Sequence, residues 1–240
     1  MSRTIAIASG KGGTGKSMVA INLAASLAHA GENVVLLDMS FGMRSLELYL
    51  GMEYKALWDI CDVINGVCDI DTAVLPVDSV KGMSLLPGTQ KCEYPELTAD
   101  SLSAIIEVLS ERFSYIILDC PPGAGYPVEC AIECTDLAVI VLTADYVALR
   151  DAEVIEEMLL RSGVMDRRYV INMVSSELKE KDAGISISEI DRGLRCRPLG
   201  MIPMDYNIRA SLAEGVPIVA KRDSYIADNF RNMAVRLIRK

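Results

Sequence analysis

Near the start of the chain, a short apolar run, Thr4 to Ala8, leads into a glycine-rich stretch. The pattern G-x-x-x-x-G-K-[ST] is met there by Gly10, Lys11, Gly12, Gly13, Thr14, Gly15, Lys16 and Ser17. Glycines let backbone N–H groups curl around phosphate oxygens, and a helix starting at this point adds partial positive charge. In this pattern Lys16 contacts the β- and γ-phosphates and Ser17 binds Mg²⁺. The stretch therefore predicts a loop that binds ATP or ADP with Mg²⁺.

Two acidic residues follow aliphatic runs further along the chain. Asp38 comes directly after Val34 to Leu37, and Asp119 comes directly after Tyr115 to Leu118. A carboxylate at the end of a strand can hold Mg²⁺ through its water shell, because Mg²⁺ gives up water reluctantly and uses few protein ligands. Either acid alone could instead be a helix cap or a turn residue. We predict that both join Ser17 in binding the metal.

These residues need a scaffold that brings distant segments together, and the chain alternates short apolar runs with longer amphipathic stretches. The predicted strands are Thr4 to Ala8, Val34 to Leu37, Met83 to Leu86, Tyr115 to Leu118, Leu137 to Leu142, Tyr169 to Ile171 and Leu199 to Ile202. The predicted helices are Lys16 to Ala30, Ala99 to Arg112, Val147 to Ser162 and Ile226 to Ile238. This alternation indicates an α/β fold, a three-layer doubly wound sheet, mainly parallel, with helices on both faces. Ligands bind at the carboxyl ends of such strands, where the loop, Asp38 and Asp119 fall.

Length and composition fit a single domain over residues 1–240. The chain has 51% hydrophobic residues, with no internal repeat and no Ser/Gly-rich linker. Its apolar runs are too short to span a bilayer, and its start lacks the pattern of a secretory signal. We therefore expect a cytoplasmic protein, at most peripheral to the inner face of the cell membrane.

Cysteine, histidine and charge patterns suggest no second site. The seven cysteines include no CxxC pair, so reduced thiols are expected, and Cys130 with Cys134 would be a poor metal site without further ligands. His29 is expected to close the first helix. The net charge of −9 argues against attraction to nucleic acid without excluding it. From Lys221 onward, however, six basic residues face two acidic ones, a pattern that a solvated helix face or an anionic partner would explain.

The loop and its surroundings resemble the MinD/ParA family of P-loop ATPases. Lys11, a second lysine inside the loop, gives the K-G-G-x-G-K form of the deviant Walker A motif. The stretch from Asp38 to Glu53 is similar to the D-x-D-x-G-L-R-N-L-D…L-G-x-E pattern of the MinD branch. Further matches are Asp62 to Gly66, Leu86-Pro87 with Gln90, Asp119-Cys120-Pro121, Arg150-Asp151-Ala152 and Gly200 to Pro203. The resemblance covers almost the whole chain up to about Val219.

The resemblance implies an ATPase that forms a homodimer across the nucleotide, with Lys11 reaching the phosphates bound by the other subunit. It implies catalytic roles for Lys11, Lys16, Asp38 and the residue at position 40. It also implies contacts of Asp151 with Lys11 or the switch region, of Asn172 with adenine, and of Pro203 with the nucleotide. A lysine on the γ-phosphate of the other subunit makes dimerisation depend on ATP, because ADP lacks that group.

Two departures from the family pattern bear on function. Ser40 stands where the family has the aspartate that positions or activates the attacking water, so we expect slow hydrolysis. The chain ends at Leu237-Ile238-Arg239-Lys240, where MinD proteins continue into an amphipathic membrane-targeting helix. The apolar residues Ile226, Phe230, Met233, Leu237 and Ile238 recur at helical spacing. We expect this last helix to pack on the sheet, with an interfacial membrane helix as the alternative.

Four functions remain open at this point. The leading one is a MinD-like spatial regulator of division-site placement that recruits a regulatory protein partner. A second is a ParA-like or orphan ATPase that positions DNA, pili or another cargo. A third, motivated by Ser40, is a scaffold that binds ATP and dimerises without hydrolysis. The last is an iron-sulfur ATPase, which the absence of a suitably spaced cysteine pair disfavours.

Overall fold

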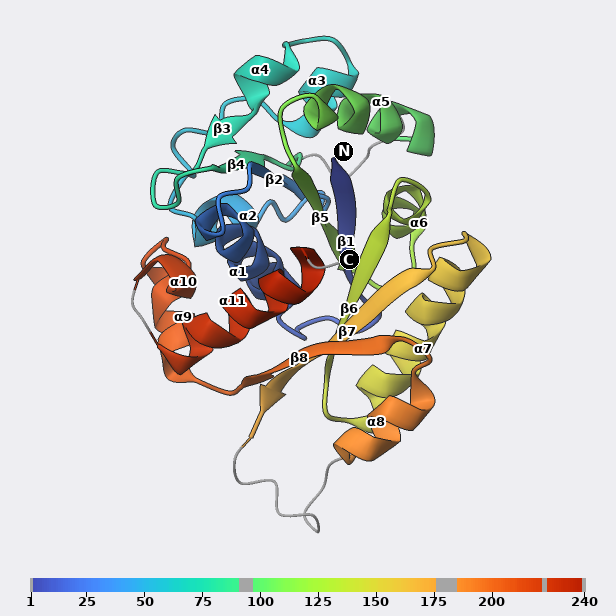
Figure 1. The fold of residues 1–240 in the computed structure, drawn as a ribbon. Coiled ribbons are helices and arrows are strands. Elements are labelled where there is room, and N and C mark those ends of the chain that lie inside the picture. Colours follow the sequence, from blue (N-terminus) through green and yellow to red (C-terminus); the bar gives the residue numbers. More distant parts are fainter. Residues whose placement is uncertain (1, 91–96, 176–184, 222–223, 239–240) are drawn as a thin grey trace.

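The computed structural model describes residues 2–90, 97–175, 185–221 and 224–238. Their strands form one sheet in the order β3-β4-β2-β5-β1-β6-β7-β8 (Figure 1). The strands are β1 (Arg3–Ser9), β2 (Val34–Asp38), β3 (Leu75–Pro76), β4 (Met83–Leu86), β5 (Tyr115–Pro122), β6 (Leu137–Thr143), β7 (Asp166–Val174) and β8 (Arg197–Pro203). Every neighbouring pair is parallel except β3 with β4. The predicted α/β fold class is confirmed.

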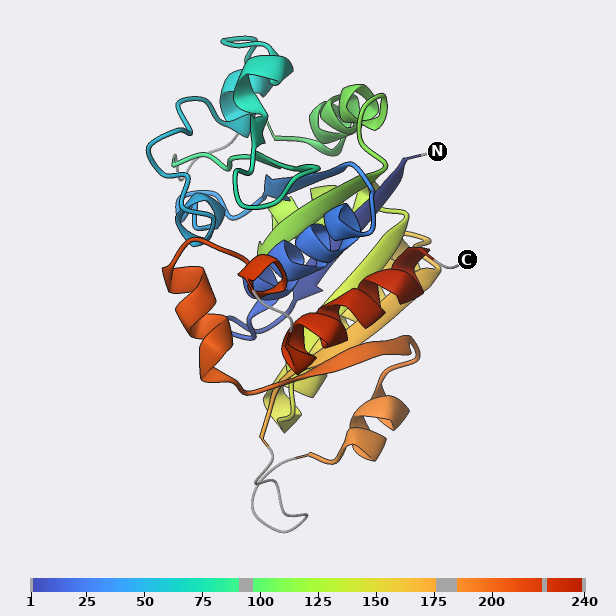
Figure 2. The same cartoon turned by 60° about the vertical axis from the view of Figure 1, so that its left-hand side comes forward.

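Helices cover both faces of the sheet (Figures 1 and 2). They are α1 (Lys16–His29), α2 (Leu46–Tyr49), α3 (Ile60–Ile64), α4 (Ile70–Ala73), α5 (Ala99–Ser110), α6 (Tyr126–Glu133), α7 (Tyr146–Arg161), α8 (Ile187–Gly193), α9 (Tyr206–Ala213), α10 (Ile218–Lys221) and α11 (Tyr225–Ile238). One apolar cluster joins the sheet to α1, α10 and α11, and a second joins it to α5, α6 and α7. The central strands are buried on both faces, which explains their near-continuous hydrophobicity.

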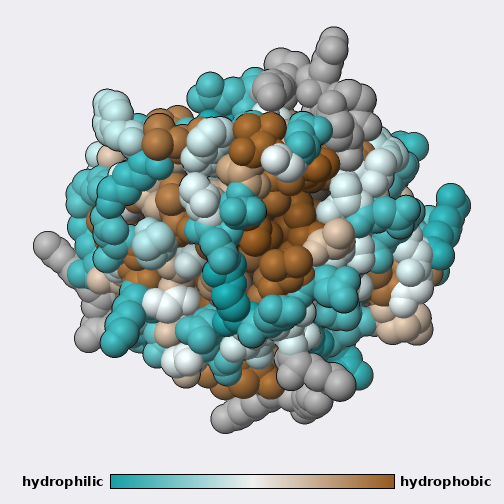
Figure 3. Space-filling model, turned by 90° about the horizontal axis from the view of Figure 1, so that it is seen from above, coloured by the Kyte–Doolittle hydropathy of each residue, from teal (hydrophilic) through white to brown (hydrophobic). Residues whose placement is uncertain are grey.

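The edge of the molecule formed by α3, α4 and α5 is less completely packed. Figure 3 looks down on this side and shows apolar side chains gathered in a hollow in the middle of the face, with polar side chains around it. The half-buried apolar residues of these helices include Val63, Ile64, Ile70 and Ile106. Their outer surfaces remain open to solvent in the described part of the chain.

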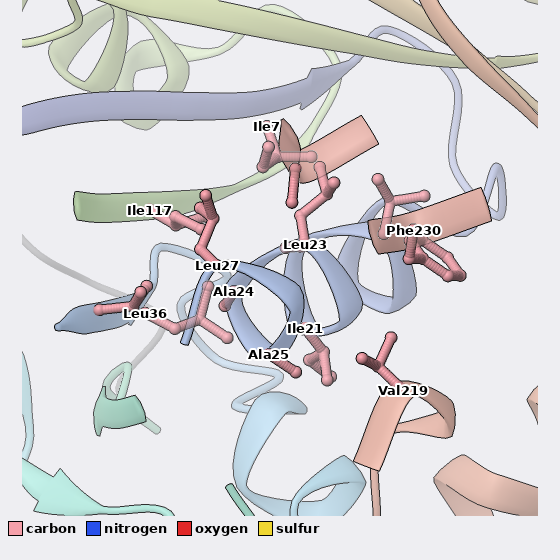
Figure 4. Packing of buried hydrophobic residues seen from close by; sticks show 14 of the residues in the cluster. Ile7, Ile21, Leu23, Ala24, Ala25, Leu27, Leu36, Ile117, Val219 and Phe230 are labelled. Carbon is pink, nitrogen blue, oxygen red and sulfur yellow. The ribbon is translucent and has the colours of Figure 1, made fainter. Parts of the chain in front are cut away.

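Helix α1 is held from all sides, which fixes the loop that precedes it. Its side chains Ile21, Leu23 and Leu27 pack between the sheet and the C-terminal helices, as Figure 4 shows. Phe230 of α11, with none of its surface exposed, is packed in the same cluster. The start of α1 therefore cannot shift without repacking the core.

The last helix, α11, packs against the sheet and α1, as predicted. Its apolar residues Ile226, Phe230, Met233 and Leu237 are buried in the cluster around α1, and Ile238 packs against it. Arg222, Arg239 and Lys240 of the basic C-terminal end lie outside the described residues. Among the helices of the described ranges, none is long and apolar enough to cross a bilayer.

Candidate nucleotide-binding site

The glycine-rich loop connects β1 to α1 and takes the shape that its glycines permit. Gly13 and Gly15 have positive φ angles of 77° and 83°, and Gly15 is the N-cap of α1. A Cβ atom at Gly10 would lie 2.5 Å from the backbone oxygen of Asp151, so α7 approaches the loop closely. The Thr14 hydroxyl donates to Ser9 Oγ at 2.9 Å, which closes the loop from inside.

A pocket of about 700 Å³ opens around this loop. Of the predicted site residues, it is lined by Lys11, Gly13, Thr14, Gly15, Lys16, Ser17, Ser40, Asn172 and Pro203. Gly10 and Gly12 belong to the loop without lining the pocket, and the carboxylates of Asp38 and Asp119 lie buried behind it. Segments from opposite ends of the sequence thus meet at the carboxyl ends of the strands, as predicted.

Asp38, the last residue of β2, lies beside Asp119 of β5, with which it is paired in register. Lys16 Nζ donates to Asp119 Oδ1 at 3.0 Å, and both side chains are almost fully buried. Burial, and after it the nearby Asp119 carboxylate, raise the pKa of Asp38 from 3.8 to about 6. Asp119 Oδ2 is buried without a hydrogen-bond partner among the described residues.

This arrangement suits a bound Mg²⁺. Two neighbouring carboxylates that repel each other, together with the hydroxyl of Ser17 at the start of α1, are the oxygen donors that Mg²⁺ prefers. A cation there would relieve the repulsion and satisfy the unpartnered oxygen of Asp119. The predicted ligands Ser17, Asp38 and Asp119 therefore have the donor chemistry that the metal needs.

Asp38 also organises the segment that carries Ser40. Its Oδ1 accepts from the Ser40 N–H at 2.8 Å, and its Oδ2 accepts from the Leu46 N–H at 3.2 Å. Further along, Arg44 has a positive φ of 44° and is buried, with its Nε donating to Glu47 Oε2 at 2.6 Å. Sequence analysis missed this ion pair, although both residues lie in the stretch that matches the MinD pattern.

Lys11 does not contact Asp151 in the described structure, and the alternative contact of Asp151 with the switch region stays a prediction. Lys11 Nζ lies 3.0 Å from both oxygens of Asp145, the N-cap of α7, and not against the carboxylate of Asp151. Hydrogen bonds from Thr143 and Ala148 also reach Asp145, and together with Lys11 they lower its pKa despite partial burial. Asp151 lies one and a half turns further along α7, where its backbone packs against Gly10. Sequence analysis applied the rule of acids after strands only to residues directly following a strand, so it missed Asp145.

Asn172, at the end of β7, is buried, and its Nδ2 donates to the backbone oxygen of Thr14 at 2.7 Å. A Cβ at Gly15 would lie 2.2 Å from that same nitrogen, so Asn172 supports the loop from below. Its predicted contact with adenine stays a prediction, although the residue does line the pocket.

Known proteins match the chain over its whole length. The sequence model of a family described as "ParA: NUBPL iron-transfer P-loop NTPase" matches residues 1–238. The septum site-determining protein MinD of Synechocystis sp. is 33% identical over 238 residues, which cover 99% of this chain and 90% of that protein. The chain belongs to the ParA/MinD family of P-loop ATPases.

Solved MinD structures have the same fold as this ParA/MinD chain. The MinC:MinD cell division protein complex of Aquifex aeolicus aligns with a TM-score of 0.90 at 25% identity, covering 100% of this chain and 96% of that chain. MinD of Pyrococcus horikoshii, solved with Mg-ADP, aligns with a TM-score of 0.86 at 26% identity, covering 100% and 97%. The resemblance to the MinD branch is therefore confirmed.

The other candidate sites of this family member stay without support. No group of three or more His, Cys, Asp or Glu side chains in the described ranges could hold a metal ion. Cys130 of α6 is buried and Cys134, the C-cap of that helix, is half-buried, and burial raises the pKa of the Cys134 thiol to about 11. His29 lies in the last turn of α1, where it was expected to close the helix.

Proposed function

We propose that residues 1–240 form one ATP-binding domain that dimerises on ATP and acts as a MinD-like spatial regulator of division-site placement. The observation that carries this proposal is that Lys11, Lys16, Ser17 and Ser40 line the same pocket. It unites the phosphate-binding groups with the signature lysine of the family. The MinD names of its relatives support the cellular role.

The signature lysine supports dimerisation in particular. Lys11 is not buried in the core: its side chain is 37% exposed, and it forms an ion pair with Asp145, whose side chain is 38% exposed. A half-exposed ion pair is worth only about 0–1 kcal/mol, so Lys11 can leave it at little cost. Reaching the γ-phosphate of a second subunit would replace that contact with a stronger, less solvated one.

Hydrolysis would rely on charge and positioning. Lys16 would stabilise the β- and γ-phosphate oxygens, while Mg²⁺, held through Ser17 with Asp38 and Asp119, would neutralise charge on the phosphates. Ser40 lines the pocket beside these groups, but its hydroxyl cannot take up a proton as a carboxylate does. The proposed enzyme is therefore a slow ATPase that releases ADP and phosphate.

Steady-state phosphate release with Mg-ATP tests the enzymatic part. The comparison is between the native protein, Ser40→Asp and, as the blank, Lys16→Ala. Turnover of the native protein above the blank supports a cycling regulator, with Ser40→Asp expected to be faster. If the native protein equals the blank while Ser40→Asp hydrolyses ATP, the chain is a scaffold that binds ATP without turnover, and the enzyme assignment is wrong.

A ParA-like or orphan cargo-positioning ATPase is the second candidate. It is favoured by the ParA name of the matching family. ATP-dependent binding to DNA would support this function, and ATP-dependent binding to anionic vesicles would support the MinD-like one. A regulatory or cargo protein is expected as a partner in both cases.

An iron-sulfur function ranks below both, although the family description mentions iron transfer. The sequence has no CxxC pair, and each cysteine pKa that departs from its usual value is raised, which disfavours the thiolate form that binds clusters. Iron analysis of the purified protein would overturn this ranking if it found a stoichiometric cluster.

A further inference from the structure

The pocket is chemically divided into two ends. One end is the glycine-rich loop with Lys11, Lys16 and Ser17, which fit phosphates. The other end is formed by the start of α1, the ends of β7 and β8, and α9. Its lining is mainly apolar, with Met18, Met173, Pro203, Met204, Ile208 and Leu212. With phosphates on the loop, the base of a nucleotide would reach this apolar end.

Arg209 brings a positively charged side chain to the apolar end of the pocket. It is exposed and lines the pocket, as does Leu212, which lies three residues further along the same face of α9. Lys11 and Lys16 are each paired with a carboxylate. Arg209, by contrast, has no ion pair or hydrogen bond within the part of the chain that the structure describes.

The helix that carries Arg209 is anchored firmly enough to hold it there. Asp205 caps α9 by accepting from the Asn207 N–H at 2.7 Å, and it also accepts from the Tyr225 hydroxyl at 2.6 Å. Ile208 is buried in the cluster around α1. The position of the Arg209 backbone at the pocket wall is therefore fixed, while its guanidinium stays free to meet a ligand.

We propose that Arg209 contacts the base of the bound nucleotide and favours a purine over a pyrimidine. A guanidinium is planar and weakly hydrated, and it stacks on aromatic rings through cation–π attraction. A purine offers it a larger ring surface than a pyrimidine does. The apolar neighbours Met204 and Ile208 would exclude water from the stacked pair and strengthen it. This inference rests on the proposed nucleotide-binding function.

The test is isothermal titration of the full chain with Mg-ATP, Mg-CTP and magnesium tripolyphosphate, which has the phosphates without a base. Arg209→Ala is expected to raise the Kd for Mg-ATP by about 3- to 30-fold, the range that cation–π contacts span. The Kd for tripolyphosphate should stay unchanged, and the preference for ATP over CTP should fall. Arg209→Lys keeps the charge without the plane, so it should lose most of that preference.

Arg192→Ala is the matched control, because Arg192 is exposed on α8 and does not line the pocket. An equal loss for ATP and tripolyphosphate in Arg209→Ala would overturn the inference by assigning Arg209 to the phosphates. Unchanged ATP and CTP binding would overturn it as well. If the native protein binds neither ATP nor tripolyphosphate, the proposed function itself fails, which is a distinct result.

Discussion

At the scale of single residues, the main feature of the site is the repulsion between two buried carboxylates. Asp38 and Asp119 face each other across paired strands, and only Lys16 offsets their charge by direct contact in the described structure. Folding places both acids where water cannot stabilise them, so the protein gives up stability that a bound cation would restore. Binding of Mg²⁺ between these carboxylates would therefore stabilise the folded protein.

The raised pKa of Asp38 predicts how stability depends on pH. Because the folded-state pKa of about 6 exceeds the usual 3.8, the folded protein holds this proton more tightly than the unfolded chain. That stabilisation is present at low pH and is lost as pH rises through about 6. Without Mg²⁺ and nucleotide, the Asp38 contribution should be about 1 kcal/mol greater at pH 5 than at pH 7.5.

Urea unfolding at both pH values measures this contribution as the difference between the native protein and Asp38→Asn. The variant carries no titrating group at position 38, so its stability should lack this component of the pH dependence. Identical pH profiles for the two proteins would contradict the prediction.

The ion pair between Lys11 and Asp145 predicts a variant that dimerises more readily. Asp145→Asn keeps a good N-cap residue on α7 but removes the charge that holds Lys11. ATP-dependent dimerisation should tighten by up to about fivefold, since a half-exposed pair is worth at most about 1 kcal/mol. Sedimentation equilibrium with Mg-ATP measures the change.

Asp151→Asn is the control for this prediction. The resemblance to the family assigns Asp151 to a contact with Lys11 or with the switch region, whereas in the structure Lys11 contacts Asp145. If Asp151→Asn tightens the dimer and Asp145→Asn does not, the observed pairing is not the one that restrains Lys11 in solution.

The same pair shows where residue-level prediction from sequence succeeds and fails. Asp38 and Asp119 could be placed because each follows an aliphatic run of a parallel strand, and Lys16 because it belongs to a recognisable loop pattern between β1 and α1. The partner of Lys11 could not be predicted, because a long flexible side chain can reach several carboxylates. Which carboxylate it contacts depends on the distance between α7 and the loop, and no local sequence pattern determines that distance.

At the scale of elements, α11 has a structural role that its sequence leaves ambiguous. Its spacing of apolar and basic residues fits both a core helix and an interfacial membrane helix. Only the packing against α1 and β8 decides between them. Because Phe230 is fully buried in that contact, Phe230→Ala should lower the free energy of unfolding by about 3–5 kcal/mol.

Val235→Ala provides the comparison on the same helix. Val235 is 39% exposed, so its truncation should change stability by no more than about 0.5 kcal/mol. Urea denaturation of both variants tests the packing of α11. Similar small losses for both would mean that the helix is detached in solution and that its apolar face is available to a membrane.

Long elements could be predicted from the sequence, and short ones could not. The central strands and helices α1, α5, α7 and α11 were found because apolar runs or several helical turns give a clear period. Helices such as α2, α4 and α10 have four residues each, too few to show a period. Strand β3 has only two residues, paired antiparallel with β4, and is too short to give an alternating pattern in the sequence.

At the scale of the whole molecule, the nucleotide site is where separate parts of the fold meet. The two apolar clusters lie on opposite faces of the sheet. The loop between β1 and α1 contacts α7 at Gly10 and β7 at Gly15. A ligand on this loop therefore bridges elements from both halves of the chain. We expect nucleotide binding to stabilise the fold globally rather than to order a single segment.

This expectation gives a prediction on ligand linkage. A ligand that binds only the folded state at a hundred times its Kd adds about 2.7 kcal/mol to the free energy of unfolding. Mg-ADP at that concentration should give this gain in urea denaturation of the native protein.

ADP with EDTA should give less, because Asp38 and Asp119 then keep their mutual repulsion. Lys16→Ala should lose most of the gain, while Lys55→Ala, at an exposed position that does not line the pocket, should keep it. Equal gains with and without Mg²⁺ would show that the buried carboxylates do not take part in metal binding.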